Sequence, residues 1–175
     1  MIKLWDWDTK KRTMLRFIKN GHIFAFEYEG NTYIFGRIVS RTITKIGTIV
    51  EFFDYISNEP VISEEIILKG KRMMYPVNLD IYALFDKKTN SEWRIIGLQE
   101  NYVPDENLFF WIGGYEDPKK IDVYGRELGK ISEEERQQIQ DFVFQGEERI
   151  RPLIKNYIET EGRPTNNYKR NTRHS

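Results

Sequence analysis

The chain has 175 residues, 39% of them hydrophobic and 14% aromatic, which is enough for one domain and too little for a two-domain enzyme that closes over its substrate. Bases and acids number 27 each, so the formal net charge of zero gives no overall attraction to nucleic acid or to acidic membranes. The lack of Cys excludes disulfides and thiolate chemistry, and two His residues exclude a histidine-rich metal centre. We therefore expect no cofactor.

The two ends of the chain differ in composition from its middle. Residues 1–8 carry acids where a secretion signal has basic and then apolar residues, and no stretch approaches 18 apolar residues, which predicts a cytoplasmic protein without membrane contact. Apolar residues among bases predict a short amphipathic helix over residues 9–17. We expect a lead-in segment over residues 1–20, one domain over 21–162, and a basic, disordered tail over 163–175.

Strand patterns dominate the middle of the chain. Aromatic and β-branched runs at 22–28 and 32–39 flank Glu29-Gly30-Asn31, which predicts a tight hairpin. Five further candidates lie at 42–54, 79–86, 93–98, 108–113 and 120–124. No helical stretch of crossover length separates most of these strands, so the sheet should be mostly antiparallel.

A helical period begins after Gly129. Ser132 and Glu135 have the spacing of a capping box, and apolar residues at helical spacing follow as far as Ile158. Pro152 predicts a break over 146–151 and a second helix that begins at the proline. The predicted fold class is α+β, with a twisted, mostly antiparallel sheet of about seven strands and the C-terminal helices packed on it.

The common catalytic motifs are missing, because the chain has no Gly-x-Ser-x-Gly, Gly-x4-Gly-Lys or Gly-x-Gly-x-x-Gly pattern. His22 could act as a base, but nothing near it in the sequence marks a partner. The commonest enzyme classes are therefore not indicated, and an enzyme with a carboxylate site is the weakest alternative. Arg37 follows Gly36 in a predicted strand, where it should pair with an acid or hold a loop.

The aromatic strands leave a second alternative open, a nucleic-acid-binding module. Exposed Phe24, Phe26, Tyr33 and Phe35, together with the basic tail, would form a stacking platform for single strands. Both faces of the first strand are apolar, however, since Ile23 alternates with these rings, so we expect that strand to be covered on both sides.

The order of the strand motifs resembles the immunity protein 26 family of bacterial polymorphic toxin and contact-dependent inhibition systems. The similarity covers about residues 20–160 and rests on short motifs at 22–26, 33–38, 52–55, 59–60, 93–97, 109–110, 117–118 and 123–125. The resemblance implies a binding protein without catalysis. Its partner would be a cognate toxin domain from a neighbouring gene, often a nuclease, with no nucleic-acid or membrane partner.

The resemblance also gives a role to two runs of acids. A nuclease holds phosphates in a basic cleft, and carboxylates that imitate the phosphates can block it. Either run can supply the interface, and the alternative for each residue is an ordinary solvated loop. The candidate toxin-binding residues are Asp54, Glu59, Glu64 and Glu65 in the first run and Asp105, Glu106, Glu116 and Asp117 in the second.

Overall fold

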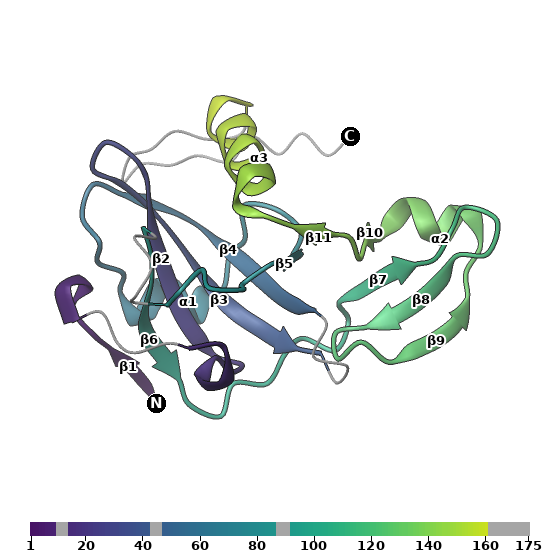
Figure 1. Ribbon diagram of the computed structural model, residues 1–175, viewed down its shortest axis with the longest axis horizontal. Helices are drawn as coiled ribbons and strands as arrows, with labels where there is room; N and C mark the ends of the chain where they lie inside the picture. The colour runs from purple at the N-terminus through teal and green to yellow at the C-terminus, as the bar shows by residue number, and fades with distance from the viewer. Residues whose placement is uncertain (10–13, 43–46, 87–91, 161–175) are drawn as a thin grey trace.

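The computed structural model describes residues 1–9, 14–42, 47–86 and 92–160. Two sheets and three helices form most of this part of the chain (Figure 1). The predicted tail and residues 10–13 of the predicted first helix lie outside the described residues; beside the latter, the chain forms 3-10 turns at Trp7–Thr9 and Leu15–Phe17. Within the described residues, no helix is long and apolar enough to cross a membrane.

The main sheet has seven strands in the order β1-β6-β2-β3-β4-β5-β11. Every neighbouring pair is antiparallel except β5 and β11, which confirms the predicted α+β class with a mostly antiparallel sheet. The strands are β1 (Ile2–Leu4), β2 (His22–Glu29), β3 (Thr32–Arg41), β4 (Thr48–Ser57), β5 (Val77–Leu79), β6 (Trp93–Gln99) and β11 (Phe144–Gln145).

The β2–β3 hairpin is the centre of this sheet. Gly30 and Asn31 take the positive φ values, 28° and 56°, that its tight turn needs. Phe24 and Phe26 on one face of β2 and Ile23 on the other have no solvent exposure, so the strand is covered on both sides as predicted. Rings that are fully buried cannot stack on bases, which removes most of the platform that the nucleic-acid alternative requires.

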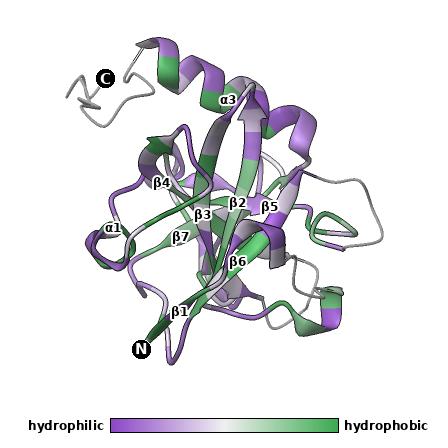
Figure 2. Ribbon diagram, turned by 90° about the vertical axis from the view of Figure 1, so that its left-hand side faces the viewer, coloured by the Kyte–Doolittle hydropathy of each residue, from purple (hydrophilic) through white to green (hydrophobic). Residues whose placement is uncertain are grey.

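Each face of the main sheet has its own apolar core. One core lies beneath α3 (Glu147–Thr160), where Trp93 stacks on Phe26 with ring centroids 3.9 Å apart. Gly36 belongs to this face because a Cβ there would lie 2.4 Å from the Phe24 ring. The other core lies beneath α1 (Glu64–Lys69) and the N-terminal segment. The central strands appear largely green in Figure 2, while α3 alternates between green and purple, as expected of a helix with one buried face.

The second sheet lies beside the main sheet and packs on a third apolar core (Figure 1). Its strand order is β10-β7-β8-β9, with α2 next to it in the chain. These elements are β7 (Phe109–Ile112), β8 (Lys119–Asp122), β9 (Glu127–Lys130), α2 (Glu133–Gln138) and β10 (Gln140–Asp141). Ser132 and Glu135 form the predicted capping box at the start of α2.

Three predicted elements were wrong. The helix predicted from Ser132 up to the break at 146–151 ends at Gln138, and the strands β10 (Gln140–Asp141) and β11 (Phe144–Gln145) follow it. Residues 79–86 are not a strand: β5 ends at Leu79, and the chain then turns so that Ile81 and Phe85 enter the core beneath α3 from a loop. The predicted break at Pro152 is also absent, because α3 begins at Glu147 and continues through the proline. Pro152 itself is exposed, and burial of Ile150 and Ile154 on the same helix offsets the hydrogen bond that the proline lacks.

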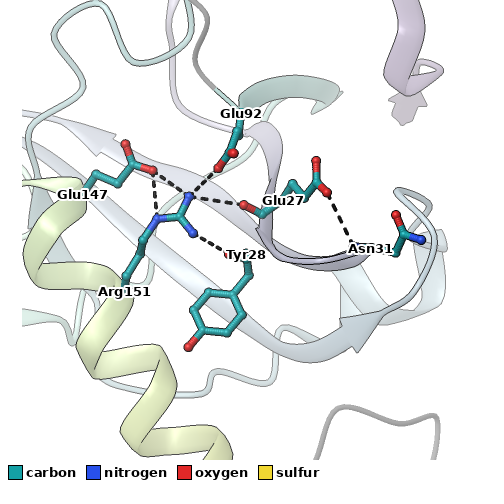
Figure 3. A network of polar contacts seen from close by, with 6 residues as sticks. All are labelled: Glu27, Tyr28, Asn31, Glu92, Glu147 and Arg151. Carbon is teal, nitrogen blue, oxygen red and sulfur yellow. Dashed lines mark hydrogen bonds and ion pairs between the residues drawn. The ribbon is translucent and has the colours of Figure 1, made fainter.

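Arg151 joins α3 to the end of β2 (Figure 3). Its guanidinium donates to the carbonyl oxygens of Tyr28, at 2.6 Å, and Glu27, at 3.2 Å, where the β2–β3 register shifts. It also pairs with Glu92 at 2.6 Å and with Glu147 at 2.8 Å. A single side chain therefore satisfies strand carbonyls that the irregular pairing leaves exposed, and it fixes the helix over the core.

Replacing Arg151 with Met keeps much of the aliphatic stem and removes all of these bonds. We expect the R151M variant to lose about 1–3 kcal/mol of unfolding free energy, since two charge-assisted bonds to carbonyls disappear. Urea denaturation measures this loss. The matched control is Arg149→Met, an exposed position on the same helix, which should change the unfolding free energy by less than about 0.5 kcal/mol. Equal effects of the two substitutions would contradict the role given to Arg151.

Candidate functional site

A buried carboxylate organises the face of the main sheet that carries α1. Glu51 on β4 has no solvent exposure and lies directly across from Arg37 on β3. Arg37 Nε donates to Glu51 Oε1 at 2.6 Å, and Arg72 Nε donates to the other carboxylate oxygen. The expected pairing of Arg37 with an acid is confirmed, and Arg72 is a second partner that the sequence pattern did not indicate.

Arg37 also holds the loop that follows β6. Its Nη1 donates to Oε1 of Gln99, and its guanidinium carbon lies 4.2 Å from the centre of the Tyr102 ring. Burial raises the pKa of the Tyr102 hydroxyl to about 12, and the nearby Glu51 carboxylate adds to this effect. The ring therefore stays neutral at physiological pH and packs as a cover over the charges. This ion cluster, defined as Arg37, Glu51 and Arg72, is structural rather than an open binding site.

Beside the ion cluster, on the same side of the sheet, the N-terminal segment and the residues before α1 enclose a groove of about 650 Å³. Figure 2 looks at the side of the molecule that carries β1 and α1. The aromatic Trp5 and Trp7 are half-buried here, whereas Val61 is 62% exposed. The lining residues are Leu4, Trp5, Asp6, Trp7, Asp8, Thr9, Pro60, Val61, Ile62 and Ile96.

Trp7 is held in place from two sides. Its ring packs edge-on against Tyr33 with centroids 5.2 Å apart, and the guanidinium of Arg94 lies 4.1 Å from the ring centre. Arg94 Nη1 also donates to the Trp7 carbonyl oxygen at 2.8 Å. The groove wall is thus ordered before any partner arrives, which lowers the entropic cost of binding.

Acids surround this groove. Asp6 and Asp8 are exposed on its N-terminal wall, and the Asp8 carboxylate lies 3.8 Å from Arg94 Nη1. Residues 60–62 form the other wall of the groove, and Glu59 precedes them in the chain. Glu64 and Glu65, the first residues of α1, follow the same wall after Ser63. Lys69 holds the pKa of the Glu65 carboxyl below its usual value through a 2.6 Å hydrogen bond. We call Asp6, Asp8, Glu59, Glu64 and Glu65, together with the lining residues, the acid-rimmed groove.

The structure separates the remaining sequence candidates from this groove. Asp54 lies under α3 on the opposite face of the sheet, where it accepts a hydrogen bond from the Tyr157 hydroxyl at 2.9 Å. Asp105 and Glu106 precede β7, whereas Glu116 and Asp117 follow it, so the two pairs lie at opposite ends of this strand. Asp105 accepts from the Asn107 backbone N–H at 3.0 Å, and Asp117 pairs with Lys130 at 2.8 Å.

Sequence reasoning missed the N-terminal wall of the groove. The alternation of aromatic and acidic residues in Trp5-Asp6-Trp7-Asp8 was the available signal, since it marks a segment that packs its rings and exposes its charges. The two rings pack against different cores, Trp5 against the core beneath α3 and Trp7 against the core beneath α1. The segment is positioned by β1, which pairs with β6 far along the chain. That pairing cannot be deduced from residues 1–9 alone.

His22 does not show the surroundings of a catalytic base. It is 8% exposed, and its Nδ1 accepts from the backbone N–H of Lys19 at 3.0 Å. Burial and the nearby positive charge of Lys19 lower the pKa of His22 to about 4. Among the described residues, no group of three or more His, Cys, Asp or Glu side chains could hold a metal ion.

Comparison with known proteins identifies the family. A family model described as Immunity protein 26 matches residues 19–116, which is more than half of the chain. The chain therefore belongs to the immunity protein 26 family, as the order of strand motifs had indicated. No curated protein and no solved structure gives a significant match.

Removing the charge of Glu51 tests the ion cluster. The Glu51→Gln variant leaves two arginines without their buried counter-ion, so we expect a loss of about 3–5 kcal/mol of unfolding free energy. Glu65→Gln is the control, since it breaks an exposed pair with Lys69 and should cost less than about 1 kcal/mol. Chemical denaturation measures the unfolding free energy of both variants. A loss for E51Q as small as that for E65Q would show that the two arginines do not need the Glu51 charge for stability.

His22 predicts a pH dependence of stability. Between pH 6.5 and about 4 the unfolded chain binds a proton at this position that the folded protein excludes, so stability should fall as the pH drops through this window. The contribution is on the order of 3 kcal/mol. His22→Asn keeps an acceptor for Lys19 and removes the titration. Thermal unfolding at pH 7, 5.5 and 4.5 should therefore show a shallower pH dependence for H22N, and identical slopes would contradict this.

Proposed function

We propose that this protein neutralises a cognate bacterial toxin by stoichiometric binding, without catalysis, and that the acid-rimmed groove is the surface that receives the toxin. Membership of an immunity protein family supports the first part. The observation that carries the second part is one groove lined by two tryptophans, the exposed Val61 and the carboxylates of Asp6 and Asp8, with Glu59, Glu64 and Glu65 exposed next to the lining residues in the chain.

The composition of the groove matches what tight interfaces use. Trp7 offers a large, pre-ordered apolar surface, Trp5 also lines the groove, and Val61 is 62% exposed. Such side chains supply most of the binding energy when a partner desolvates them. Arg94 pairs with Asp8 and Lys69 pairs with Glu65, whereas Asp6, Glu59 and Glu64 form no ion pair with any described residue.

The rim favours a partner with a basic surface. Carboxylates around a groove attract such a partner during diffusion and discriminate against acidic ones. A nuclease that binds phosphates with Lys and Arg fits this requirement, and covering its basic cleft would exclude the substrate. We therefore propose a nuclease domain, encoded beside this chain and met in the cytoplasm, as the partner.

The second acidic run is the alternative surface. Asp105, Glu106, Glu116 and Asp117 lie at the two ends of β7 and share no groove with the tryptophans. This run could still meet a toxin that covers the second sheet. Asp54 is not part of either proposal, because its carboxylate is bound beneath α3.

Neutralising four rim acids tests the proposal. In the variant Asp8→Asn, Glu59→Gln, Glu64→Gln and Glu65→Gln, we expect toxin affinity to fall at least tenfold, mainly through a slower association rate, because long-range attraction is lost. Surface plasmon resonance at two salt concentrations measures the rate and its salt dependence, and survival of toxin-expressing cells measures protection.

The matched control carries the same change of charge in the other run, with Asp105→Asn, Glu106→Gln, Glu116→Gln and Asp117→Asn. This variant should bind and protect like the parent protein. If the control loses affinity and the groove variant does not, the interface lies at β7 instead. If both retain full affinity, the carboxylates have no part in recognition. Unfolding midpoints close to that of the parent protein are required of both variants.

A further inference from the structure

The backbone of β1 has polar groups that point away from the sheet. The N–H of Trp5 donates to the carbonyl of Ile96 at 2.7 Å, and the N–H of Glu100 donates to the carbonyl of Met1 at 2.9 Å. Residues 1, 3 and 5 therefore direct their backbone groups toward β6. Since these directions alternate along a strand, the N–H and C=O of Ile2 and Leu4 face the opposite way.

β1 is an edge strand of the seven-stranded sheet. No described residue forms a backbone hydrogen bond with the outward-facing groups of Ile2 and Leu4. Such an open edge can pair with another chain. The edge runs straight into the acid-rimmed groove, because Leu4 is both the end of β1 and a lining residue, and it is 39% exposed.

We propose that an extended, basic segment of the toxin pairs with β1 as an added strand and places its side chains over the acid-rimmed groove. This inference rests on the proposed function and specifies how the partner is held. Main-chain bonds to Ile2 and Leu4 would fix the position of the segment, and the groove would select its side chains.

Charge around the edge indicates the chemistry of that segment. Asp6 and Asp8 continue the chain directly beyond β1, and both are exposed at the groove. Lys3 on β1 is already paired with Glu100 at 2.6 Å, so it does not cancel these charges. Lys or Arg side chains alternating with apolar ones would therefore meet the rim carboxylates and the tryptophans together.

The other edge strands of the two sheets, β9, β10 and β11, are less suited to strand addition. In β9 the pairing with β8 is irregular, and Gly129 has a φ of 104°, which bends the strand. Glu127 and Lys130 of that strand also pair with Lys119 and Asp117. At the far edge of the main sheet, β11 offers two residues. The remaining edge strand, β10 of the second sheet, also offers two residues. Of these four edges, β1 has backbone groups that no described residue binds and adjoins the acid-rimmed groove.

The decisive comparison is Leu4→Pro against Leu4→Ala. Proline removes the outward N–H of residue 4 and leaves the bonds between β1 and β6 in place, whereas alanine removes the side chain and keeps the N–H. We expect L4P to bind the toxin at least tenfold more weakly than L4A, with similar unfolding midpoints. Lys3→Pro is the contrasting control, because it removes an inward N–H and should destabilise the folded protein.

Hydrogen exchange of the wild-type protein gives a second measurement that needs no variant. The Leu4 amide should exchange fast in the free protein and at least tenfold more slowly in the complex. Equal affinity of L4P and L4A, or an unprotected Leu4 amide in a stable complex, would overturn the strand-addition inference and leave the proposed function intact. Failure of the wild-type protein to form any complex would overturn both. If L4P does not fold, the exchange measurement decides.

Discussion

The requirement to neutralise Glu51 inside the protein connects the parts of this fold. Its side chain projects from β4 between those of Ile49 and Phe53, on the same face of the sheet. Phe53 belongs to the apolar core beneath α1, and Ile49 belongs to the apolar core on which the second sheet packs. A charge in that position is stable only with close counter-ions, which Arg37 and Arg72 provide. Because the two arginines come from β3 and from the residues after α1, satisfying one carboxylate fixes the strand register, the end of α1 and the loop at Tyr102 together.

Interior contacts of the main sheet fall within the residues that match the family. Gly36 makes room for the Phe24 ring, Arg37 pairs with Glu51, and Trp93 stacks on Phe26. The matched residues 19–116 contain all of these contacts. The N-terminal wall of the acid-rimmed groove lies outside the matched residues, which agrees with a common scaffold on which the proposed partner-binding segment can vary independently.

The proposed surface also shows why neighbouring acids in a sequence need not act together. Asp54 and Glu59 are five residues apart, yet Asp54 projects beneath α3 while Glu59 adjoins the groove on the other side of the sheet. Asp6 and Glu64 are far apart in the chain and flank the same groove, because β1 pairs with β6 and brings the N-terminal segment beside α1. Alternation along strands and long-range pairing, rather than local charge density, decide which carboxylates a partner meets together.

By itself the sequence determined the fold class, the β2–β3 hairpin, the burial of both faces of β2, the capping box at Ser132 and the family, because these depend on local turn chemistry and on hydrophobic periodicity. Tertiary structure alone decided that residues 80–86 form a loop that buries Ile81 and Phe85 and that α3 continues through Pro152, since packing against the core outweighed local preference in both places. The tertiary structure also decided which arginines pair with Glu51. It likewise decided that Trp5, Trp7 and residues 60–62 line the same groove. Those contacts link positions from 14 to more than 50 residues apart, and no local pattern encodes which of them will meet.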